Sequence, residues 1–349
     1  MKTILTALAA TVAFPLTLAA QELEAPSVPA TQASPFAFAE SGGKAEAAAS
    51  AQEADSAGRV IGGEVAADNA WPWQVALLIA AAPRTADAQF CGGSMVLDRW
   101  VLTAAHCIHM QDPNGVYRDL APGAISVLVG TNQIAEGMGD AVPVEKIIRH
   151  PAYIGEEFDN DIALIKLARA PNVPYQTIKV PDSQFGDMLD QPGVPTIVTG
   201  WGLIEGAQRT DMMRQAEIQM LSRDNCNQVM LESRAKAAAE GITYAASAFG
   251  LKQDETERVW QELITYVREP MTENMLCSGT FEGGKGSCSG DSGGPLVVPL
   301  NDGSYIQAGI VSWGLSNTTT KSCLETAQFS AYTRVSNYLE WLDQTVAAN

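Results

Sequence analysis

Short apolar runs rich in β-branched residues recur along the chain, and this pattern restricts the fold more than any other feature of the sequence. Turn residues separate the runs, and each run has the length of a strand rather than that of a helix. Short strands at this spacing predict an all-β barrel arrangement. The expected strands cover residues 75–80, 94–97, 125–129, 162–167, 196–199, 216–221, 296–298 and 306–311.

One serine stands in a glycine-rich turn just before such a run, in the segment GDSGGP at positions 290–295. Glycines let the backbone bend sharply and approach a ligand closely, because they lack a Cβ atom. Such a turn can present a serine hydroxyl and aim neighbouring N–H groups at one point, as acyl transfer requires. Ser292 is therefore a candidate nucleophile. The alternative for this motif alone is a Gly/Ser loop between strands.

A serine hydroxyl is a weak nucleophile until a base takes its proton, and the chain offers three histidines. His106 lies in VLTAAHC at 101–107, where an apolar run enters a turn of small residues. Asp161 opens the segment DIAL at the mouth of another apolar run, and Asp159 is its nearby competitor. For His109 and His150 we expect surface or turn roles.

The segments TAAHC, DIAL and GDSGGP, in this order, resemble the signatures of the chymotrypsin-like (trypsin-fold) serine proteases. The resemblance extends from about Arg59 to the C-terminus. It implies two six-stranded antiparallel β-barrels and a C-terminal helix over about residues 336–346. Further matching segments are WPWQV (71–75), CGGS (91–94), TGWG (199–202), SWG (312–314) and AYTRV (331–335).

The same resemblance implies a serine endopeptidase that acts through an acyl-enzyme without a cofactor. Ser292 would attack the scissile carbonyl, and His106 would take its proton and return one to the leaving amine. Asp161 would hold His106 in the required tautomer. His106 and Asp161 would come from the first barrel and Ser292 from the second. The backbone N–H groups of Gly290 and Ser292 would form the oxyanion hole.

The mapping also places the pocket for the substrate residue that precedes the scissile bond (P1). Its base is Gly286, six residues before Ser292, where a trypsin-like enzyme carries aspartate. Without that carboxylate a buried Lys or Arg would lack a partner, so we expect an apolar P1 residue. A deep pocket would give a chymotrypsin-like preference, and a pocket filled by side chains would give an elastase-like one. Glu282 and Glu325 on flanking loops would add negative charge, so a basic P1 residue is the remaining alternative. The implied substrate-binding residues are Gly286, Ser287, Ser312, Trp313, Gly314 and Ser330.

The N-terminal region has the pattern of an exported precursor. Residues 1–20 combine Lys2, an apolar run and small residues, which predicts a signal peptide cut after Ala19 or Ala20. The run is shorter than the roughly 20 apolar residues of a membrane span and contains Pro15. Residues 21–59, rich in Ala, Pro, Glu and Ser, predict a disordered pro-segment. We expect a secreted or periplasmic protein whose protease domain covers residues 60–349.

The pro-segment ends in Arg59-Val60-Ile61, which resembles the activation site of the family. Cleavage after Arg59, by an activating protease or by self-cleavage, would free the ammonium group of Val60. This group would pair with Asp291, which would otherwise be a buried unpaired charge. The resemblance therefore implies a zymogen. The alternative is that Arg59 is an ordinary linker residue and Asp291 a turn-former.

Six cysteines in an exported chain predict disulfides, although the sequence alone does not fix their pairing. The resemblance implies the pairs Cys91–Cys107, Cys226–Cys277 and Cys288–Cys323. We expect no metal, because neither a CxxC nor an HExxH motif occurs. The calcium loop of the family would lie near residues 130–140, where Thr131 replaces an acidic ligand.

Two insertions distinguish the chain from the family pattern. The longer one, about residues 227–271, has helical patterns over 232–240 and 255–267, linked by 250–254. Val259, Leu263 and either Tyr266 or Val267 would share one face. We expect a helical hairpin packed on the barrel surface, and the alternative is an exosite or lid. The second insertion, residues 315–322, would restrict extended substrates.

The chain is acidic, with 22 Lys and Arg against 40 Asp and Glu, which gives a net charge of −18. This charge disfavours nucleic acid and anionic membranes as partners. We expect a monomer that acts on proteins or peptides. A non-catalytic binding protein on the same scaffold is the alternative class. The retention of His106, Asp161, Ser292 and a cleavable Arg59 favours the enzyme.

Overall fold

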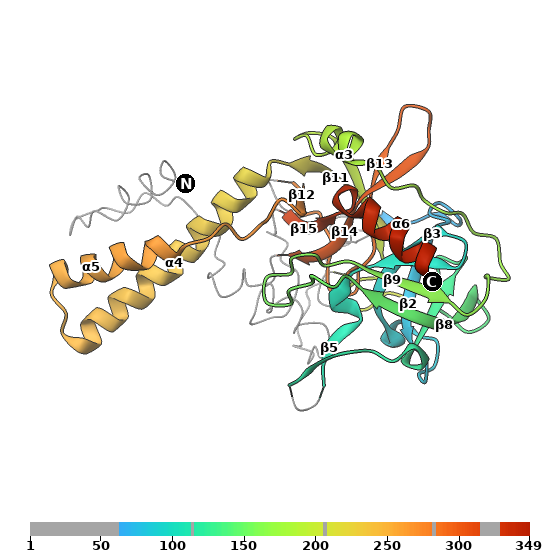
Figure 1. Cartoon of the computed structure of the whole chain (residues 1–349), viewed down its shortest axis with the longest axis horizontal. Coiled ribbons are helices and arrows are strands. Elements are labelled where there is room, and N and C mark those ends of the chain that lie inside the picture. Colours follow the sequence, from blue (N-terminus) through green and yellow to red (C-terminus); the bar gives the residue numbers. More distant parts are fainter. Residues whose placement is uncertain (1–62, 113–114, 205–207, 281–283, 315–328) are drawn as a thin grey trace, which may run out of the picture.

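The computed structural model describes residues 63–349 except 113–114, 205–207, 281–283 and 315–328. Two β-rich lobes lie against each other, and a helical arm projects from one of them (Figure 1). The expected signal peptide and pro-segment, the bond after Arg59 and the insertion 315–322 lie outside the described residues.

The first lobe is a closed barrel of six antiparallel strands. In spatial order they are β2 (Gln74–Ile79), β3 (Gln89–Leu97), β4 (Trp100–Thr103), β9 (Ala163–Leu167), β8 (Asp140–Arg149) and β7 (Ile125–Val129), and β7 pairs again with β2. Apolar side chains such as Leu77, Met95 and Leu164 fill its interior and are fully buried. A hairpin of β5 (His109–Gln111) and β6 (Tyr117–Asp119) lies outside this barrel.

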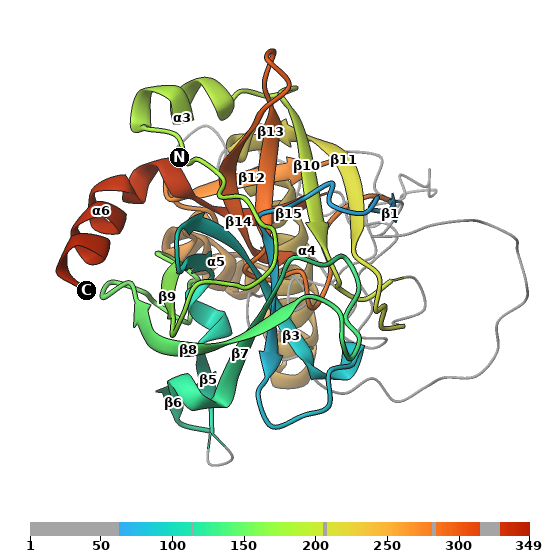
Figure 2. The same ribbon diagram turned by 90° about the vertical axis from the view of Figure 1, so that its right-hand side faces the viewer.

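The second lobe is also a closed six-stranded antiparallel barrel. Its order is β11 (Arg214–Leu221), β10 (Pro195–Gly200), β13 (Pro295–Pro299), β14 (Tyr305–Gly314), β15 (Phe329–Arg334) and β12 (Met275–Gly279), and pairing of β12 with β11 closes it. The short β1 (Glu64–Val65) adds to β11 from outside. Figure 2 shows the two barrels stacked, with α3 (Ser183–Leu189) and α6 (Leu339–Ala348) at their periphery. The prediction of two six-stranded barrels with a C-terminal helix is confirmed.

All eight expected strands match observed strands, six of them lying fully within the observed bounds and two extending one residue beyond them, but the sequence pattern missed others. Strand β8 carries Pro143 and the charged pair Glu145–Lys146, so its apolar alternation is weak. Strand β12 reads MLCSG and is fully buried, although Cys, Ser and Gly give little β-propensity. Strand β8 forms by pairing with β7 and β9, and β12 by pairing with β11 and β15, which are distant from it in the sequence. A local pattern does not contain these pairings.

The junction of the barrels is held by an aromatic cluster. The ring centroids of Trp71 and Trp73 are 6.0 Å apart, and Tyr305 of β14 lies 5.1 Å from Trp71. Apolar burial of this kind is the main driving force for docking two lobes. The interior of the first barrel continues through this cluster to Ile310 of the second. The barrels therefore form one packed body.

The long insertion forms a helical arm, which consists of α4 (Arg223–Phe249), α5 (Gln253–Leu263) and the short 3-10 turn η6 (Ile264–Tyr266). Ser222 caps the start of α4, and Gly250 ends it in the left-handed conformation at φ +68°. The Ala-rich sequence from residue 235 to 248 favours a helix much longer than the one expected.

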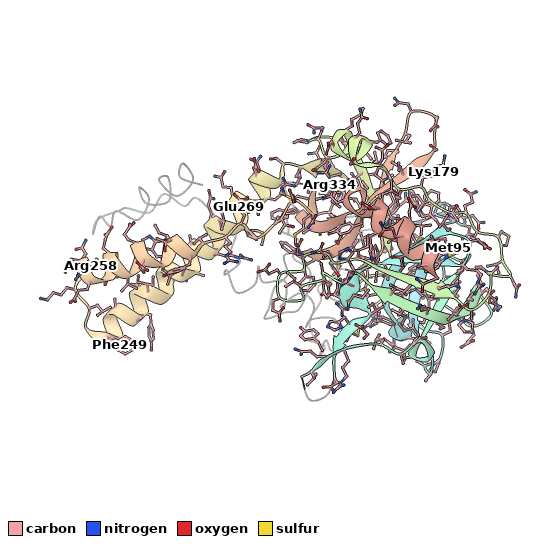
Figure 3. The ribbon with its side chains drawn as sticks, viewed as in Figure 1. Met95, Lys179, Phe249, Arg258, Glu269 and Arg334 are labelled. Carbon is pink, nitrogen blue, oxygen red and sulfur yellow. A yellow bond between two sulfur atoms is a disulfide. The ribbon has the colours of Figure 1, made fainter. Side chains whose placement is uncertain are left out.

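One expectation about this insertion was wrong. The hairpin is not packed on the barrel surface: it projects outward, with Phe249 and Arg258 at its far end (Figure 3). Phe249 is 80 % exposed and Tyr244 is 78 % exposed. The expected apolar face with Val259 and Leu263 is also exposed. The helices pack mainly against each other, so only the root of the arm meets the barrel.

Disulfides brace the fold at two described positions. Cys91 of β3 pairs with Cys107, and Cys226 at the root of α4 pairs with Cys277 of β12. These are two of the pairs that the resemblance implied. Cys288 is also disulfide-bonded, and its expected partner Cys323 lies outside the described residues. Within the described ranges, no helix is both long and apolar enough to cross a membrane.

Candidate active site

His106 and Asp161 form a buried pair at the ends of two neighbouring strands. His106 lies in the 3-10 turn η3 (Ala105–Cys107) after β4, and Asp161 lies just before β9. The register of β4 with β9 brings these ends together. Nδ1 of His106 is 2.7 Å from Oδ2 of Asp161, and the backbone N–H of His106 donates to Oδ1 at 2.8 Å. A carboxylate at Nδ1 holds the proton there and leaves Nε2 as an acceptor.

The second barrel also binds Asp161, whose side chain is completely buried. Ser312 Oγ of β14 donates to Oδ2 at 2.5 Å, and Thr333 Oγ1 of β15 donates to the backbone oxygen at 2.7 Å. Donors of this kind compensate the desolvation of a buried carboxylate. Sequence reasoning placed Ser312 among the substrate-binding residues and missed both of these contacts. The orientation of His106 thus depends on both barrels.

Ser292 lies in a tight turn that leads into β13 and touches the first barrel. Its carbonyl accepts a hydrogen bond from the N–H of Gly92 in β3 at 2.7 Å. The next residue, Gly293, has φ +80°, and a Cβ atom there would lie 2.2 Å from Thr103 Oγ1. Only glycine fits this approach, so the turn is fixed against the strand that leads to His106. Among the described residues, no hydrogen bond joins Ser292 Oγ to His106.

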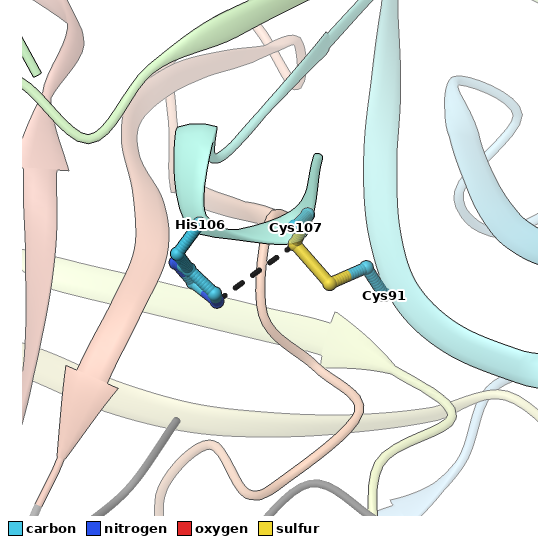
Figure 4. Close-up of side chains that lie close together, drawn as sticks. All are labelled: Cys91, His106 and Cys107. Atoms are coloured by element: carbon cyan, nitrogen blue, oxygen red, sulfur yellow. Dashed lines mark hydrogen bonds between the residues drawn. A yellow bond between two sulfur atoms is a disulfide. The ribbon is translucent and has the colours of Figure 1, made fainter. Parts of the chain in front are cut away.

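The surroundings of His106 include a disulfide. Nε2 of His106 is 3.8 Å from Sγ of Cys107, which is bonded to Cys91 (Figure 4). A histidine and two cysteines at this spacing resemble a metal-binding group. Thiolate, however, is the sulfur ligand of metals, and both sulfur atoms are used in the disulfide. This cluster is therefore structural.

Gln89, which sequence reasoning did not single out, lies in the same strand as Gly92 and also holds the turn. Its side chain is almost completely buried, and Nε2 donates to the carbonyl of Gly290 at 2.7 Å and to that of Cys91 at 3.0 Å. Gly290 adopts φ +101°, and the Gln89 amide supports this unusual backbone conformation. Gly290 and Ser292 are the two residues whose N–H groups were expected to bind an oxyanion.

Asp291 is buried against the segment TGWG. Its carboxylate accepts from the N–H of Gly202 at 2.7 Å and from that of Cys288 at 2.8 Å. A Cβ atom at Gly200 would lie 2.2 Å from Oδ1, so this glycine makes room for the carboxylate. Burial raises the pKa of Asp291 to about 6, although the two backbone donors oppose this shift. Val60, its expected partner, lies outside the described residues.

The raised pKa of Asp291 predicts a pH-dependent stability in the uncleaved chain. The folded pKa of about 6 exceeds the ordinary value of 3.8, so this stabilising contribution is complete below pH 3.8 and is lost as the pH rises through 6. The loss amounts to about 3 kcal/mol relative to Asp291→Asn. Denaturant unfolding of both uncleaved proteins from pH 4 to pH 7 measures it. Parallel pH profiles for the two proteins would contradict the prediction.

The expected P1 pocket residues lie together on neighbouring segments. Gly314 of β14 pairs with Ser330 of β15, and Ser330 Oγ lies 2.8 Å from Ser287 Oγ. Among the described residues, a Cβ atom at Gly286 would meet only Ser330 Oγ, at 3.7 Å. Trp313 is completely buried beside them. These described groups are neutral, and small side chains surround the position that Gly286 leaves open.

The competing candidates lie apart from the His106–Asp161 pair. Asp159 accepts hydrogen bonds from Thr272 and Asn274. His109 instead contacts Asp119 at 2.6 Å. His150 packs against the rings of Tyr338 and Trp341, and burial lowers its pKa. Of the three histidines, only His106 contacts Asp161.

Two closed six-stranded barrels, with a buried His–Asp pair and a serine turn at their junction, define the class of double-barrel serine proteases. Comparison with known proteins supports a closer assignment. The Trypsin family model matches residues 60–342. Bovine anionic trypsin is 32 % identical over 308 residues, which cover 86 % of this chain and 95 % of the relative. Rat cationic trypsin-3 is 32 % identical over 301 residues, which cover 84 % and 92 %. The chain therefore belongs to the trypsin family of serine endopeptidases.

Proposed function

We propose that the chain hydrolyses peptide bonds through Ser292, His106 and Asp161. The observation that carries this proposal is the His106–Asp161 pair, which follows β4, the strand whose last residue, Thr103, contacts the Ser292 turn. Ser292 Oγ bonds to the scissile carbonyl carbon while Nε2 of His106 takes its proton. His106 then protonates the leaving amine as the C–N bond breaks. Water hydrolyses the resulting ester by the same proton route in reverse.

The charge that develops on the carbonyl oxygen needs fixed donors. In our proposal these are the backbone N–H groups of Gly290 and Ser292. Support comes from the contacts that fix both ends of the turn: Gln89 holds Gly290, and Gly92 holds Ser292. Loss of one donor of this kind typically costs about 2.7–4 kcal/mol of transition-state stabilisation.

For the P1 residue we propose an apolar side chain. Gly286 at the pocket base and Ser330 on its wall carry no charge, so a buried Lys or Arg would lose its hydration without gaining a counter-charge. The similarity to trypsins supports a basic P1 residue as the second candidate. A peptide library cut by the processed enzyme distinguishes the two. Cleavage after Phe, Tyr, Leu or Met supports the neutral pocket, and cleavage after Arg or Lys overturns it.

A single substitution at the pocket base should reverse this preference. In Gly286→Asp, the added Cβ atom would lie 3.7 Å from Ser330 Oγ, the one neighbour within 4 Å among the described residues, and the carboxylate would enter the space beyond it. We expect the ratio of kcat/KM for Arg over Phe substrates to rise by about 100-fold, because a buried cation gains its partner. The matched control is Gly241→Asp, which adds the same charge in the arm, where nothing lies within 4 Å. An unchanged ratio in Gly286→Asp would remove Gly286 from the pocket.

We further propose that the protein is exported as a monomeric zymogen, to a secreted or periplasmic location. The signal-like start and the Arg59-Val60 segment support this proposal, as does the buried Asp291, which lacks a basic partner in the described part of the chain. An activating protease or a second copy of the enzyme would cleave after Arg59. Proteins or peptides are the proposed substrates, and the net charge of −18 argues against nucleic acid.

A further inference from the structure

The segment that carries Asp161 has a strained backbone. Phe158 has φ +53° and Asn160 has φ +56°, so two residues with side chains adopt the left-handed region within four positions. This region is unfavourable for residues with a Cβ atom, and a bulky side chain makes it rarer still. Such backbone strain persists only where the surrounding structure holds it. The contacts that hold this segment therefore bear on the position of Asp161.

Apolar packing keeps part of the strained segment in place. Phe158 is 3 % exposed and packs in one buried cluster with Met230 of α4 and with Met271, which follows the arm. The same ring lies 5.4 Å from the ring of His106, measured between centroids. Phe158 thus connects the root of the helical arm with the imidazole.

Hydrogen bonds to the carboxylate of Asp159 also keep the strained segment in place. Its Oδ1 accepts from Thr272 Oγ1 at 2.7 Å and from Asn274 Nδ2 at 3.1 Å. Its Oδ2 accepts from the side chain of Asn160 at 3.1 Å. One carboxylate therefore joins the strained segment of the first barrel to the segment that leads from the arm back to β12. Hydrogen bonds to a charged acceptor are stronger than those between two neutral groups.

The root of the arm is a rigid base for this link. Asn227 of α4 binds the backbone of Met271 twice, since Met271 N–H donates to its Oδ1 at 2.8 Å and its Nδ2 donates to the Met271 carbonyl at 3.2 Å. One residue before Asn227, Cys226 is linked to Cys277 of β12. Thr272 and Asn274 lie between these two fixed points.

We propose that Asp159 is a positioning residue, which anchors the strained segment 158–161 to the root of the arm and so sets the orientation of Asp161 and, through it, of His106. The proposal rests on the catalytic roles proposed above for these two residues. It gives the long insertion a part in the reaction through its root. Asp159 does not contact the substrate in this proposal.

The test compares Asp159→Ala with Asp159→Asn, which keeps an oxygen that accepts from Thr272 and Asn274. For Asp159→Ala we expect kcat to fall by about 10- to 100-fold, because small misplacements of catalytic groups are costly. KM should stay within about twofold, since the pocket is unchanged. The acid limb of the kcat/KM profile should move to lower pH, because a misaligned Asp161 stabilises the imidazolium less. Asp159→Asn should recover most of kcat.

The matched control is Asp182→Ala. The carboxylate of Asp182 also accepts a hydrogen bond, here from the backbone N–H of Phe185, but it caps the remote helix α3. We expect this control to lower the melting temperature and to leave kcat and the pH profile unchanged. A second variant, Thr272→Val, removes one donor and retains Asp159, so it decides the question if Asp159→Ala fails to fold. Asn160 keeps its own bonds to Ala152 and Tyr338 in every variant.

Three results would overturn the proposal. The first is wild-type kcat and pH profile in folded Asp159→Ala or, where that variant does not fold, in Thr272→Val. The second is an equal loss of kcat in Asp182→Ala, which would indicate general destabilisation. The third is a processed wild-type chain that hydrolyses no peptide, which would overturn the proposed function itself. Active-site titration in each sample separates a lower kcat from a smaller fraction of competent enzyme.

Discussion

Replacement of Ser292 by alanine is expected to lower kcat by about 10⁶-fold, to the residual level that binding and oxyanion donors alone provide. The reason is that the Oγ atom of Ser292 forms the covalent bond in the proposed mechanism. His106→Ala should cost about as much by itself, and the double variant should be no slower than either single one. The non-additivity is informative, because it shows that the two groups act in one step. Hydrolysis of a peptide amide by the processed enzymes measures all three.

The control for this prediction is Ser304→Ala. Ser304 lies in the turn between β13 and β14, where its hydroxyl binds Asp302. This variant should keep wild-type kcat, whereas Ser292→Ala should also lose the burst of product that reports an acyl-enzyme. Activity of Ser292→Ala within about tenfold of wild type would rule out the proposed nucleophile. Equal activity of all variants would point to a contaminating protease.

Replacement of Arg59 by glutamine is expected to keep the exported chain uncleaved and at least about 100-fold less active than the processed enzyme. Without a free Val60 ammonium, the buried Asp291 carboxylate has no cationic partner of the proposed kind. Asp291 lies between Gly290 and Ser292, the proposed oxyanion donors, so its position affects both. The mass of the N-terminus and the rate of peptide hydrolysis are measured on the same samples.

The control for Arg59 is Arg258→Gln, which removes an exposed arginine at the far end of the arm (Figure 3). This variant should be cleaved and activated as the wild type is. Full activity of an intact Arg59→Gln chain would mean that the active-site turn is ordered without cleavage. Cleavage at another bond followed by activity would place the activation site elsewhere.

Local pattern predicted the fold well because the barrel strands carry their own signal. Runs such as 125–129 and 162–167 are β-branched and bounded by turns, and both became strands. The packing of the arm was predicted poorly because the prediction there also relied on local pattern alone. Val259 and Leu263 have the spacing of a buried helix face, but burial depends on a partner surface that spacing does not supply.

Within the candidate site, the sequence indicated the proposed reactive groups better than the residues that hold them in position. His106, Asp161 and Ser292 stand in motifs with distinct compositions. Ser312, by contrast, lies 151 residues from Asp161 along the chain and meets it only when the barrels dock. Gln89 likewise reaches Gly290 across 201 residues. No local pattern contains such contacts, so the supports had to come from the three-dimensional structure.

The helical arm gives this protease a problem of self-digestion. Tyr244 and Phe249 protrude from it, and they are residues of the kind that the proposed pocket selects. A protease of this fold binds its substrate as an extended strand. The helical backbone of α4 therefore protects the peptide bonds that follow Tyr244 and Phe249. Phe249 is the last residue of α4, where helix ends fray most readily, and Gly250 follows it. With the proposed apolar P1 preference, we therefore expect the lifetime of the enzyme in a concentrated solution to depend on the stability of the last helical turn of α4, far from the active site.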